Sequence, residues 1–305
     1  MNTAVLFLIF NRPDTTERVL ESIRKARPER LYVACDGPRR RHASDYNDVL
    51  RTRAVVEQGT DWACHLQTRF LQENLGCARA VASAIDWFFE QEEEGIILED
   101  DCLPDPSFFR FCEELLQRYR ADPSIGHIGG NTFFPGAKKM EKSYYASRLN
   151  HIWGWATWRR AWKHYDHTMH QWTEFRNSSK LMHIAGSRKS RRHWHYHFNS
   201  AFRDHIDSWD YRWTFACWKN ELVSLLPKKN LVANIGFDTR ATHTTGTTTG
   251  NPAAKADSLE FPLQHPPNIK IYEVADRFVQ EQYFSRLPGP RRRLKQFLKT
   301  LIPSH

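Results

Sequence analysis

The sequence predicts an α/β fold in which helices flank a mostly parallel sheet. Two patterns in residues 1–135 predict it. Short apolar runs alternate with segments that carry helical signals, and this alternation is typical of a parallel sheet with helices on both faces. The first run, residues 5–10, is apolar throughout rather than at every second position, as expected of a strand buried on both faces.

The expected elements follow in chain order. Strands are predicted at residues 5–10, 31–35, 95–98 and 125–128, and helices after Asp14, over 78–89 and over 106–119. Asp14 is expected to be the N-cap of the first helix, with Glu17 as its capping-box partner. Pro106 falls in a first helical turn, where its missing N–H costs little.

Composition and charge exclude several classes of protein. The chain has 305 residues, of which 40% are hydrophobic, and a formal net charge of +9. That hydrophobic share excludes a disordered chain, and no apolar run approaches the ~20 residues that span a bilayer. The run at residues 4–10 lacks the basic start and cleavage site of a signal peptide. The six cysteines form no C-x-x-C pair, so we expect reduced thiols and a cytoplasmic protein.

The character of the chain changes near residue 136. Nine of the eleven tryptophans fall between Trp153 and Trp218, so residues 136–285 are predicted to form a second, aromatic-rich half of the same domain as residues 1–135. Residues 239–257 are rich in Thr, Gly and Ala and predict a loop. Residues 286–305 carry Arg and Lys but no acid and form a separate basic tail.

The most informative motif is a row of three acids, Glu99, Asp100 and Asp101, directly after an apolar strand. Three carboxylates at the edge of a core repel one another unless a cation lies there. Oxygen ligands suit Mg²⁺ or Mn²⁺, and open α/β sheets bind ligands at the carboxyl ends of their strands. The alternative is a solvated acidic turn that caps the following helix.

Other charged residues follow strands or start helices. Arg12 follows the first strand, Asp36 the second, and Arg79 lies at the start of the helix after Asn74-Leu75-Gly76. Arginines near a helix N-terminus can bind a diphosphate. Each arginine alone is also compatible with a plain surface cation, and it is their shared position that favours a site.

Together these motifs resemble those of GT-A type glycosyltransferases. The resemblance covers residues 4–135 well and about 150–245 less tightly. It rests on Asn11-Arg12-Pro13, Asp36-Gly37, Asn74-Leu75-Gly76 and the acidic box of residues 96–109, which ends in Phe-Phe. The box is especially similar to that of the N-acetylglucosaminyltransferase I family, and also to bacterial sugar transferases of the broad family-two kind.

The resemblance implies a role for each matching residue. Asp36 would bind the nucleobase of a nucleoside-diphosphate sugar, expected to be a UDP-sugar, and Arg12 would lie beside its nucleotide. Arg79 is a candidate donor-binding residue from its position at the helix start alone. Glu99 and Asp100 would touch the sugar and ribose. Asp101 would be the direct ligand of Mn²⁺ (or Mg²⁺), which neutralises charge that grows on the leaving diphosphate.

The second half supplies candidates for the acceptor side. Trp153 and Trp155 flank Gly154 and are predicted to line the acceptor pocket, although the helical spacing of Trp155, Trp158 and Trp162 also fits a core. Asp210 lies between aromatic residues and matches the general base of an inverting transferase. Asp207 is its fallback, and a capping acid is the competing interpretation.

Three further features carry weaker predictions. The resemblance makes His243 a second metal ligand, with residues 239–257 as a lid. His193, His195 and His197 alternate and would share a face on a strand, as in a zinc site, but no fourth ligand is evident. The basic stretch of residues 180–203 could meet an anionic acceptor.

The tail defines the expected partners. Over residues 291–302 its apolar positions follow helical spacing among cations, which predicts either contact with an anionic membrane or a helix docked on the protein. Together with the tail, the resemblance implies a hexosyl- or N-acetylhexosaminyltransferase of polysaccharide or lipopolysaccharide synthesis, acting on a glycan or lipid-linked acceptor. No nucleic acid is expected as a partner.

Two other functions remain as alternatives. A sugar nucleotidyltransferase would share the sheet but should carry a Gly-rich loop with Arg and Lys after the first strand, where this chain has Asn11-Arg12-Pro13-Asp14. A non-catalytic protein bound to nucleic acid or membrane through the +9 charge leaves the acidic row unexplained.

Overall fold

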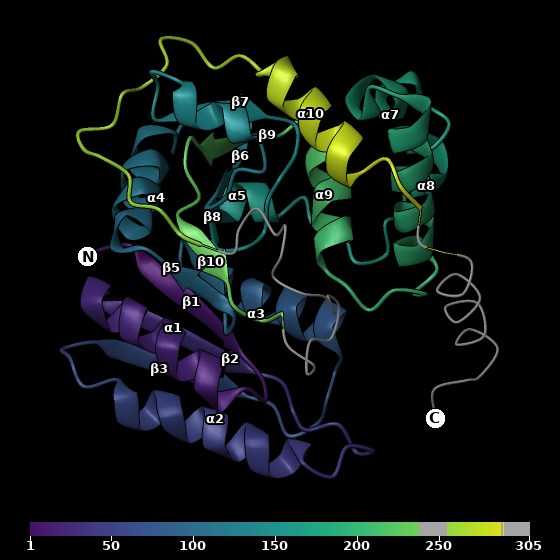
Figure 1. The fold of residues 1–305 in the computed structure, drawn as a ribbon. Helices are drawn as coiled ribbons and strands as arrows, with labels where there is room; N and C mark the ends of the chain where they lie inside the picture. Colours follow the sequence, from purple (N-terminus) through teal and green to yellow (C-terminus); the bar gives the residue numbers. More distant parts are fainter. Residues whose placement is uncertain (238–254, 288, 290–305) are drawn as a thin grey trace.

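The computed structural model describes residues 1–237, 255–287 and 289 (Figure 1). It confirms the α/β fold: an eight-stranded, mixed sheet has the order β3-β2-β1-β4-β8-β6-β9-β7, and β10 and β5 form a small second sheet. The strands are β1 (Ala4–Ile9), β2 (Arg30–Cys35), β3 (His65–Phe70), β4 (Glu94–Glu99), β5 (Cys102–Pro104), β6 (Ile125–Gly129), β7 (Tyr144–Ser147), β8 (Trp155–Trp158), β9 (Val223–Pro227) and β10 (Val232–Asn234).

Helices pack on both faces of the large sheet (Figure 1). They are α1 (Pro13–Ala26), α2 (Asp45–Gly59), α3 (Cys77–Gln91), α4 (Pro106–Arg118), α5 (Arg159–Trp162), α6 (Trp172–Phe175), α7 (Ser179–Ala185), α8 (Arg188–Phe202), α9 (Asp210–Lys219) and α10 (Glu273–Tyr283), with a 3₁₀ turn η1 (Pro135–Lys139).

Strand β1 shows why both faces need cover. Val5, Phe7 and Ile9 belong to the core that contains the apolar residues of α1, α2 and α4. Leu6 and Leu8 belong to the opposite core, with those of α3, α8 and α9. Because side chains alternate along a strand, a strand with helices on both sides must be apolar at every position, as the sequence predicted.

The two halves of the chain share the large sheet. Strands β1 to β4 run parallel to one another, and β8 then inserts antiparallel between β4 and β6. As a result the N-terminal end of β8 lies at the same edge as the carboxyl ends of β1, β2, β4 and β6. This edge is where the acidic row was expected to meet a ligand.

One local prediction is wrong, and the strand that a zinc site of three alternating histidines would need does not form. Helix α1 begins at Pro13, one residue before the predicted cap Asp14, and its N-cap position is Arg12 with no side-chain cap bond. Pro13 favours the first helical position because it needs no N–H partner there. His193, His195 and His197 lie on α8, not on a strand, so they do not share one face.

The remaining general expectations concern membranes and cysteines. Within the described part of the chain, no helix is long and apolar enough to cross a membrane. All six cysteines are free, in agreement with the expected thiols.

Candidate functional site

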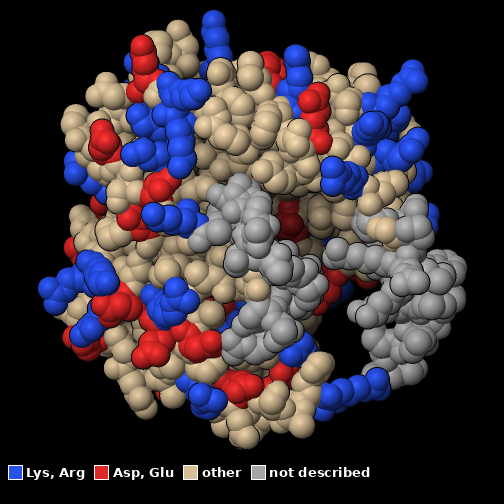
Figure 2. All heavy atoms as spheres, in the orientation of Figure 1, with Lys and Arg blue, Asp and Glu red and all other residues tan. Residues whose placement is uncertain are grey.

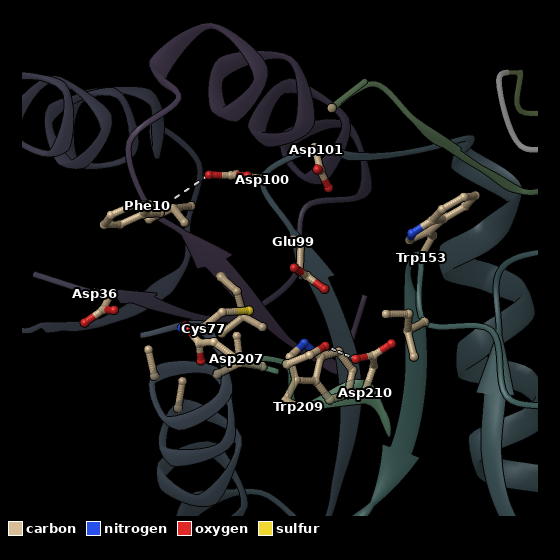
Figure 3. Close-up of a pocket in the computed structure, with 18 of the residues that line it drawn as sticks. Phe10, Asp36, Cys77, Glu99, Asp100, Asp101, Trp153, Asp207, Trp209 and Asp210 are labelled. Atoms are coloured by element: carbon tan, nitrogen blue, oxygen red, sulfur yellow. Dashed lines mark hydrogen bonds between the residues drawn. The ribbon is translucent and has the colours of Figure 1, made fainter. Parts of the chain in front are cut away.

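A cavity of about 600 Å³ opens at the carboxyl edge of the sheet. Its walls follow the strand order: Asp36 comes from the end of β2, Arg12 from the end of β1, Glu99 from β4 and Trp153 from the approach to β8. Figure 3 shows Asp36 and Trp153 on opposite sides of the acidic row. The sheet therefore brings together residues that are far apart in the sequence.

The acidic row points in more than one direction. Asp100 is 8% exposed and accepts a hydrogen bond from the Phe10 N–H at 3.0 Å, which turns it toward β1. Burial, and then the charge of Asp101, raises the pKa of Asp100 to about 7. Burial also raises the pKa of Glu99 well above its ordinary value, with the neighbouring acids adding to the effect. The row therefore places three carboxyl groups close together with little positive charge beside them.

Arg12 supplies that counter-charge. Its Nη1 lies 3.0 Å from Oδ2 of Asp101, and the arginine side chain is 10% exposed. Gly236, just after β10, makes this close approach feasible, because a Cβ there would lie 2.1 Å from Asp101 Oδ2 and 2.8 Å from Arg12 Nη1. The need for glycine at this position was not recognised from the sequence, since it depends on a strand more than a hundred residues away.

The described residues contain only part of the predicted metal-ligand set. Among the described residues, no group of three His, Cys, Asp or Glu side chains is placed to hold a metal ion. His243 lies outside the described residues, as do most of the predicted lid at 239–257 and nearly all of the tail. Mg²⁺-type ions commonly take one or two carboxylates and complete their shell with substrate phosphates and water. The surplus of buried carboxylate charge at the row fits such an ion.

Asp36 fastens a loop beside the cavity. Its Oδ1 accepts hydrogen bonds from the N–H groups of Gly37 (2.8 Å) and Leu75 (2.9 Å), and its Oδ2 accepts from Asn74 Nδ2 (2.9 Å) and the Gly76 N–H (3.1 Å). A carboxylate has about four acceptor positions, and these four bonds fill them. These bonds give Asp36 a structural task beside the cavity, and its contact with a nucleobase stays a prediction.

A charged shelf next to Asp36 was missed by the sequence analysis. Arg39 lines the cavity, lies over the Phe10 ring at 5.3 Å, and pairs with buried Asp45 through its Nε at 2.6 Å. Asn11 donates a further hydrogen bond to Asp45 at 2.9 Å. The shelf of Phe10, Asn11 and Arg39 offers an aromatic face, an amide and one guanidinium at the β1–β2 end of the cavity.

The N-terminus of α3 is capped by a distant acid. Asp207 accepts hydrogen bonds from the N–H groups of Cys77 (2.9 Å) and Ala78 (2.7 Å). Gly76 has φ +80°, and a Cβ there would lie 2.7 Å from Asp207 Oδ2. This helix end is thus occupied by a carboxylate of the protein itself, rather than open for a diphosphate, and Asp207 is a cap rather than the fallback base. Arg79 is exposed on α3 and does not line the cavity.

We expect Asp207→Ala to lower the free energy of unfolding by about 1 kcal/mol, the usual cost of a lost N-cap. Urea denaturation measures the change, and amide hydrogen exchange should quicken at Cys77 and Ala78. Asp207→Asn retains one carbonyl acceptor and should lose less. Equal exchange rates in wild type and Asp207→Ala would contradict the capping role.

The two predicted acceptor tryptophans separate at Gly154. Trp153 lines the cavity and packs edge-on against Phe133 and Phe237 at 5.4 and 5.7 Å. Trp155 is 1% exposed and stacks on Trp209 at 5.5 Å in the core, so it does not form a cavity wall. Gly154 has φ +67°, a backbone conformation that favours glycine, and this turn sends the two side chains to different places.

Asp210 is the first residue of α9 and lines the cavity. Ser208 Oγ donates a hydrogen bond to its Oδ1. In Figure 3 Asp210 and Glu99 point toward each other across the cavity, and the charge of Asp210 is one of those that raise the pKa of Glu99. The predicted base thus faces the acidic row.

The cations of the basic stretch, residues 180–203, do not line the cavity. Four cations are exposed on α8, namely Arg188, Lys189, Arg191 and Arg192. Figure 2 shows blue residues gathered over α7 and α8. On the same helix, His193 Nδ1 lies 2.6 Å from the Arg286 carbonyl oxygen, which gives this histidine a structural partner.

Comparisons with known proteins report distant likeness to solved structures. No protein-family model and no curated protein sequence matches the chain. A UTP-bound UGPase from Acinetobacter baumannii is 8% identical, with 99% of this chain and 100% of that chain covered at a TM-score of 0.39. A UDP-glucose pyrophosphorylase complexed with UDP-glucose is 13% identical, with 48% of this chain and 63% of that chain covered at 0.28.

A third similar structure is a 4-diphosphocytidyl-2C-methyl-D-erythritol synthase from Anaerococcus prevotii, which is 7% identical, with 58% of this chain and 78% of that chain covered at a TM-score of 0.32. The match to the UDP-glucose pyrophosphorylase spans less than two thirds of that protein's length. The names of these structures correspond to the nucleotidyltransferase alternative rather than to a glycosyltransferase. Likenesses of this size do not identify a shared activity.

Proposed function

We propose that the protein is a glycosyltransferase that moves a sugar from a nucleoside-diphosphate sugar, with UDP as the expected nucleotide, to a hydroxyl of a glycan or lipid-linked acceptor. One observation carries the proposal: a carboxylate row at the end of β4 faces a second acid, Asp210, across a cavity at the carboxyl edge of the sheet. Glycosyl transfer needs one set of groups that stabilises the leaving diphosphate and a separate base that takes the proton of the attacking hydroxyl.

The nucleotide is assigned to the β1–β2 end of the cavity. The shelf of Phe10, Asn11 and Arg39 provides a face for a base and donors for ribose or phosphate oxygens. The loop held by Asp36 forms the wall beside it. Arg12, which already neutralises Asp101 at 3.0 Å, is the guanidinium nearest the acidic row and would orient the diphosphate.

Asp101 is the carboxylate that would hold Mn²⁺ or Mg²⁺, and His243 stays the proposed further ligand. Glu99 and Asp100 would lie beside the sugar and ribose of the donor. When bound, such an ion supplies positive charge for the leaving diphosphate. Asp101 would be a ligand of that ion, and Arg12, at 3.0 Å, holds the Asp101 carboxylate in place.

Asp210 is assigned the role of general base. The acceptor oxygen forms a bond to the anomeric carbon, the bond from that carbon to the diphosphate oxygen breaks, and the hydroxyl proton passes to the Asp210 carboxylate. Attack from the side opposite the leaving group inverts the anomeric configuration. NMR of the anomeric proton in the product tests this, since a retained configuration would contradict the role of Asp210.

Thermal unfolding with nucleotides is the first test. We expect one nucleoside diphosphate, with Mn²⁺, to stabilise the wild type, because a ligand at a hundred times its dissociation constant adds about 2.7 kcal/mol. Asp101→Ala should lose the Mn²⁺-dependent part of the shift. Asp61→Ala is the control and should keep that part of the shift, because Asp61 belongs to an exposed ion pair with Arg24 and does not line the cavity. If no nucleotide stabilises the wild type, the proposed function is wrong.

A sugar nucleotidyltransferase is the second candidate, and the names of the similar solved structures are the reason to test it. Its reaction joins a nucleoside triphosphate to a sugar 1-phosphate and releases pyrophosphate. Incubation of the protein with that pair, beside incubation with nucleotide sugars and glycan acceptors, separates the two. Pyrophosphate release would replace our main proposal with this one.

A further inference from the structure

The far end of the cavity, beyond the acidic row, contains buried polar groups that no described residue satisfies. Asn150 and His151 lie between β7 and β8 and line the cavity. Both polar atoms of the Asn150 side chain and Nε2 of His151 are buried and have no hydrogen-bond partner within the described residues. His151 is only 4% exposed.

Such groups are unfavourable in the free protein. A buried donor or acceptor without a partner costs about 1–3 kcal/mol, and native structures contain few of them. The neighbouring His127 shows the ordinary arrangement. Its Nε2 lies 3.0 Å from the His151 carbonyl oxygen, and its Nδ1 accepts a hydrogen bond from Trp213 Nε1 at 3.3 Å. Two adjacent residues left unsatisfied at a cavity wall therefore indicate a ligand that supplies the missing partners.

Aromatic rings surround these polar groups. Phe133 packs against the His151 ring at 4.2 Å and against Trp153 at 5.4 Å. Tyr283 also packs against Phe133, with the ring centroids 5.5 Å apart. Among these rings Phe133 and Trp153 line the cavity. A wall of rings with a few inward polar groups suits a ligand that has an apolar face and hydroxyls at its rim.

The charge at this end distinguishes between ligands. Burial, and then the neighbouring His127, lowers the pKa of His151 to about 3, so its imidazole is neutral at pH 7. A neutral imidazole offers one donor and one acceptor, which matches a hydroxyl. Asp210 lines the same cavity, and its carboxylate would repel an anion.

From this geometry we propose that Asn150 and His151, with the rings of Phe133 and Trp153, form a subsite for an uncharged pyranose of the acceptor, and that their side chains determine specificity by hydrogen bonding to its hydroxyls. This inference rests on the proposed glycosyl transfer, which it extends by naming the acceptor class. It assigns Asn150 and His151 a binding role and not a part in the chemistry.

Imidazole ¹⁵N NMR of histidine-labelled protein tests the subsite directly. The probes are methyl glycosides of neutral hexoses and N-acetylhexosamines, compared with a glucuronide and a hexose phosphate, each with and without UDP and Mn²⁺. We expect at least one neutral glycoside to shift the His151 Nε2 resonance, while that of His127, which already has partners, moves less. The anionic sugars should leave His151 unchanged.

Variants separate binding from structure. His151→Leu should lose at least tenfold in glycoside affinity while its melting temperature stays equal or rises, because an unsatisfied polar group has been removed. His151→Gln retains a donor and an acceptor and should recover part of the affinity. Ser224→Ala is the matched control: Ser224 Oγ is also buried without a described partner, but it does not line the cavity. It should change stability alone.

The outcomes also separate this inference from the proposed function. If a nucleotide binds but no neutral glycoside shifts His151, or if the anionic sugars shift it more, the subsite is wrong while the donor site stands. A melting temperature of His151→Leu well below that of the wild type, with glycoside affinity unchanged, would likewise overturn it. If no nucleotide binds, the proposed function itself fails.

Discussion

Asp210→Asn is expected to reduce the turnover number by about 10²–10⁴-fold, the usual contribution of a positioned general base. Asparagine keeps the size of the side chain and can still accept from Ser208 Oγ, which bonds Asp210 Oδ1. It cannot take the proton from the acceptor hydroxyl. Because Asp210 faces the acidic row and not the nucleotide shelf, nucleotide affinity should change little.

Steady-state transfer assays and nucleotide titrations, run on the same preparations, measure both quantities. Asp61→Asn is the control, since Asp61 pairs with Arg24 at an exposed position and should leave turnover unchanged. A variant Asp210→Asn that retains nearly full turnover would show that another group removes the proton. A variant with lost nucleotide binding would instead place Asp210 on the donor side.

Arg212→Met is expected to lower the free energy of unfolding by about 3 kcal/mol or more, since each hydrogen bond from a charged donor contributes about 1.5–3 kcal/mol. Arg212 is 1% exposed. It donates to three carbonyl oxygens, those of His167, Ser208 and Ala201, at 2.7–2.8 Å. Methionine fills much of the same volume but leaves these carbonyls without their donor.

The same substitution should also disturb the segment that positions Asp207 and Asp210. Arg212 also donates to the Asp204 carboxylate, so it fixes both ends of the segment that carries Asp207 and leads into Asp210. Urea denaturation gives the stability change, and Arg203→Met serves as the control because Arg203 is exposed on the same segment and should stay within about 0.5 kcal/mol of the wild type. Equal stability of the two variants would refute the structural role of Arg212.

Much of the fold could be predicted because several strands are continuous apolar runs in the sequence. Residues 5–10 and 95–98 are apolar throughout, and the structure places β1 and β4 there. Strand β3 (His65–Phe70) and helix α2 (Asp45–Gly59) were not predicted. Every residue of β3 is at least partly exposed, as befits an edge strand, so its sequence lacks a clear apolar pattern.

The site was predictable in its composition but less so in its geometry. An acid after each of two strands suggested ligand contacts, yet what Asp36 does depends on the loop at Asn74–Gly76, which meets it only in the fold. The same holds for Asp207, whose partners are some 130 positions earlier in the chain. The spacing of Trp153 and Trp155 could not reveal that a positive φ at Gly154 separates them.

The insertion of β8 between β4 and β6 also affects how the chain is made. Strand β4 pairs with β1 on one side and has its other partner, β8, only at Trp155–Trp158. During synthesis, the ribosome must add about sixty more residues before the open edge of this apolar strand can be covered. Exposed hydrophobic edges recruit further strands and promote aggregation. The nascent first half is therefore a natural client for a chaperone, and expression of residues 1–135 alone should yield inclusion bodies.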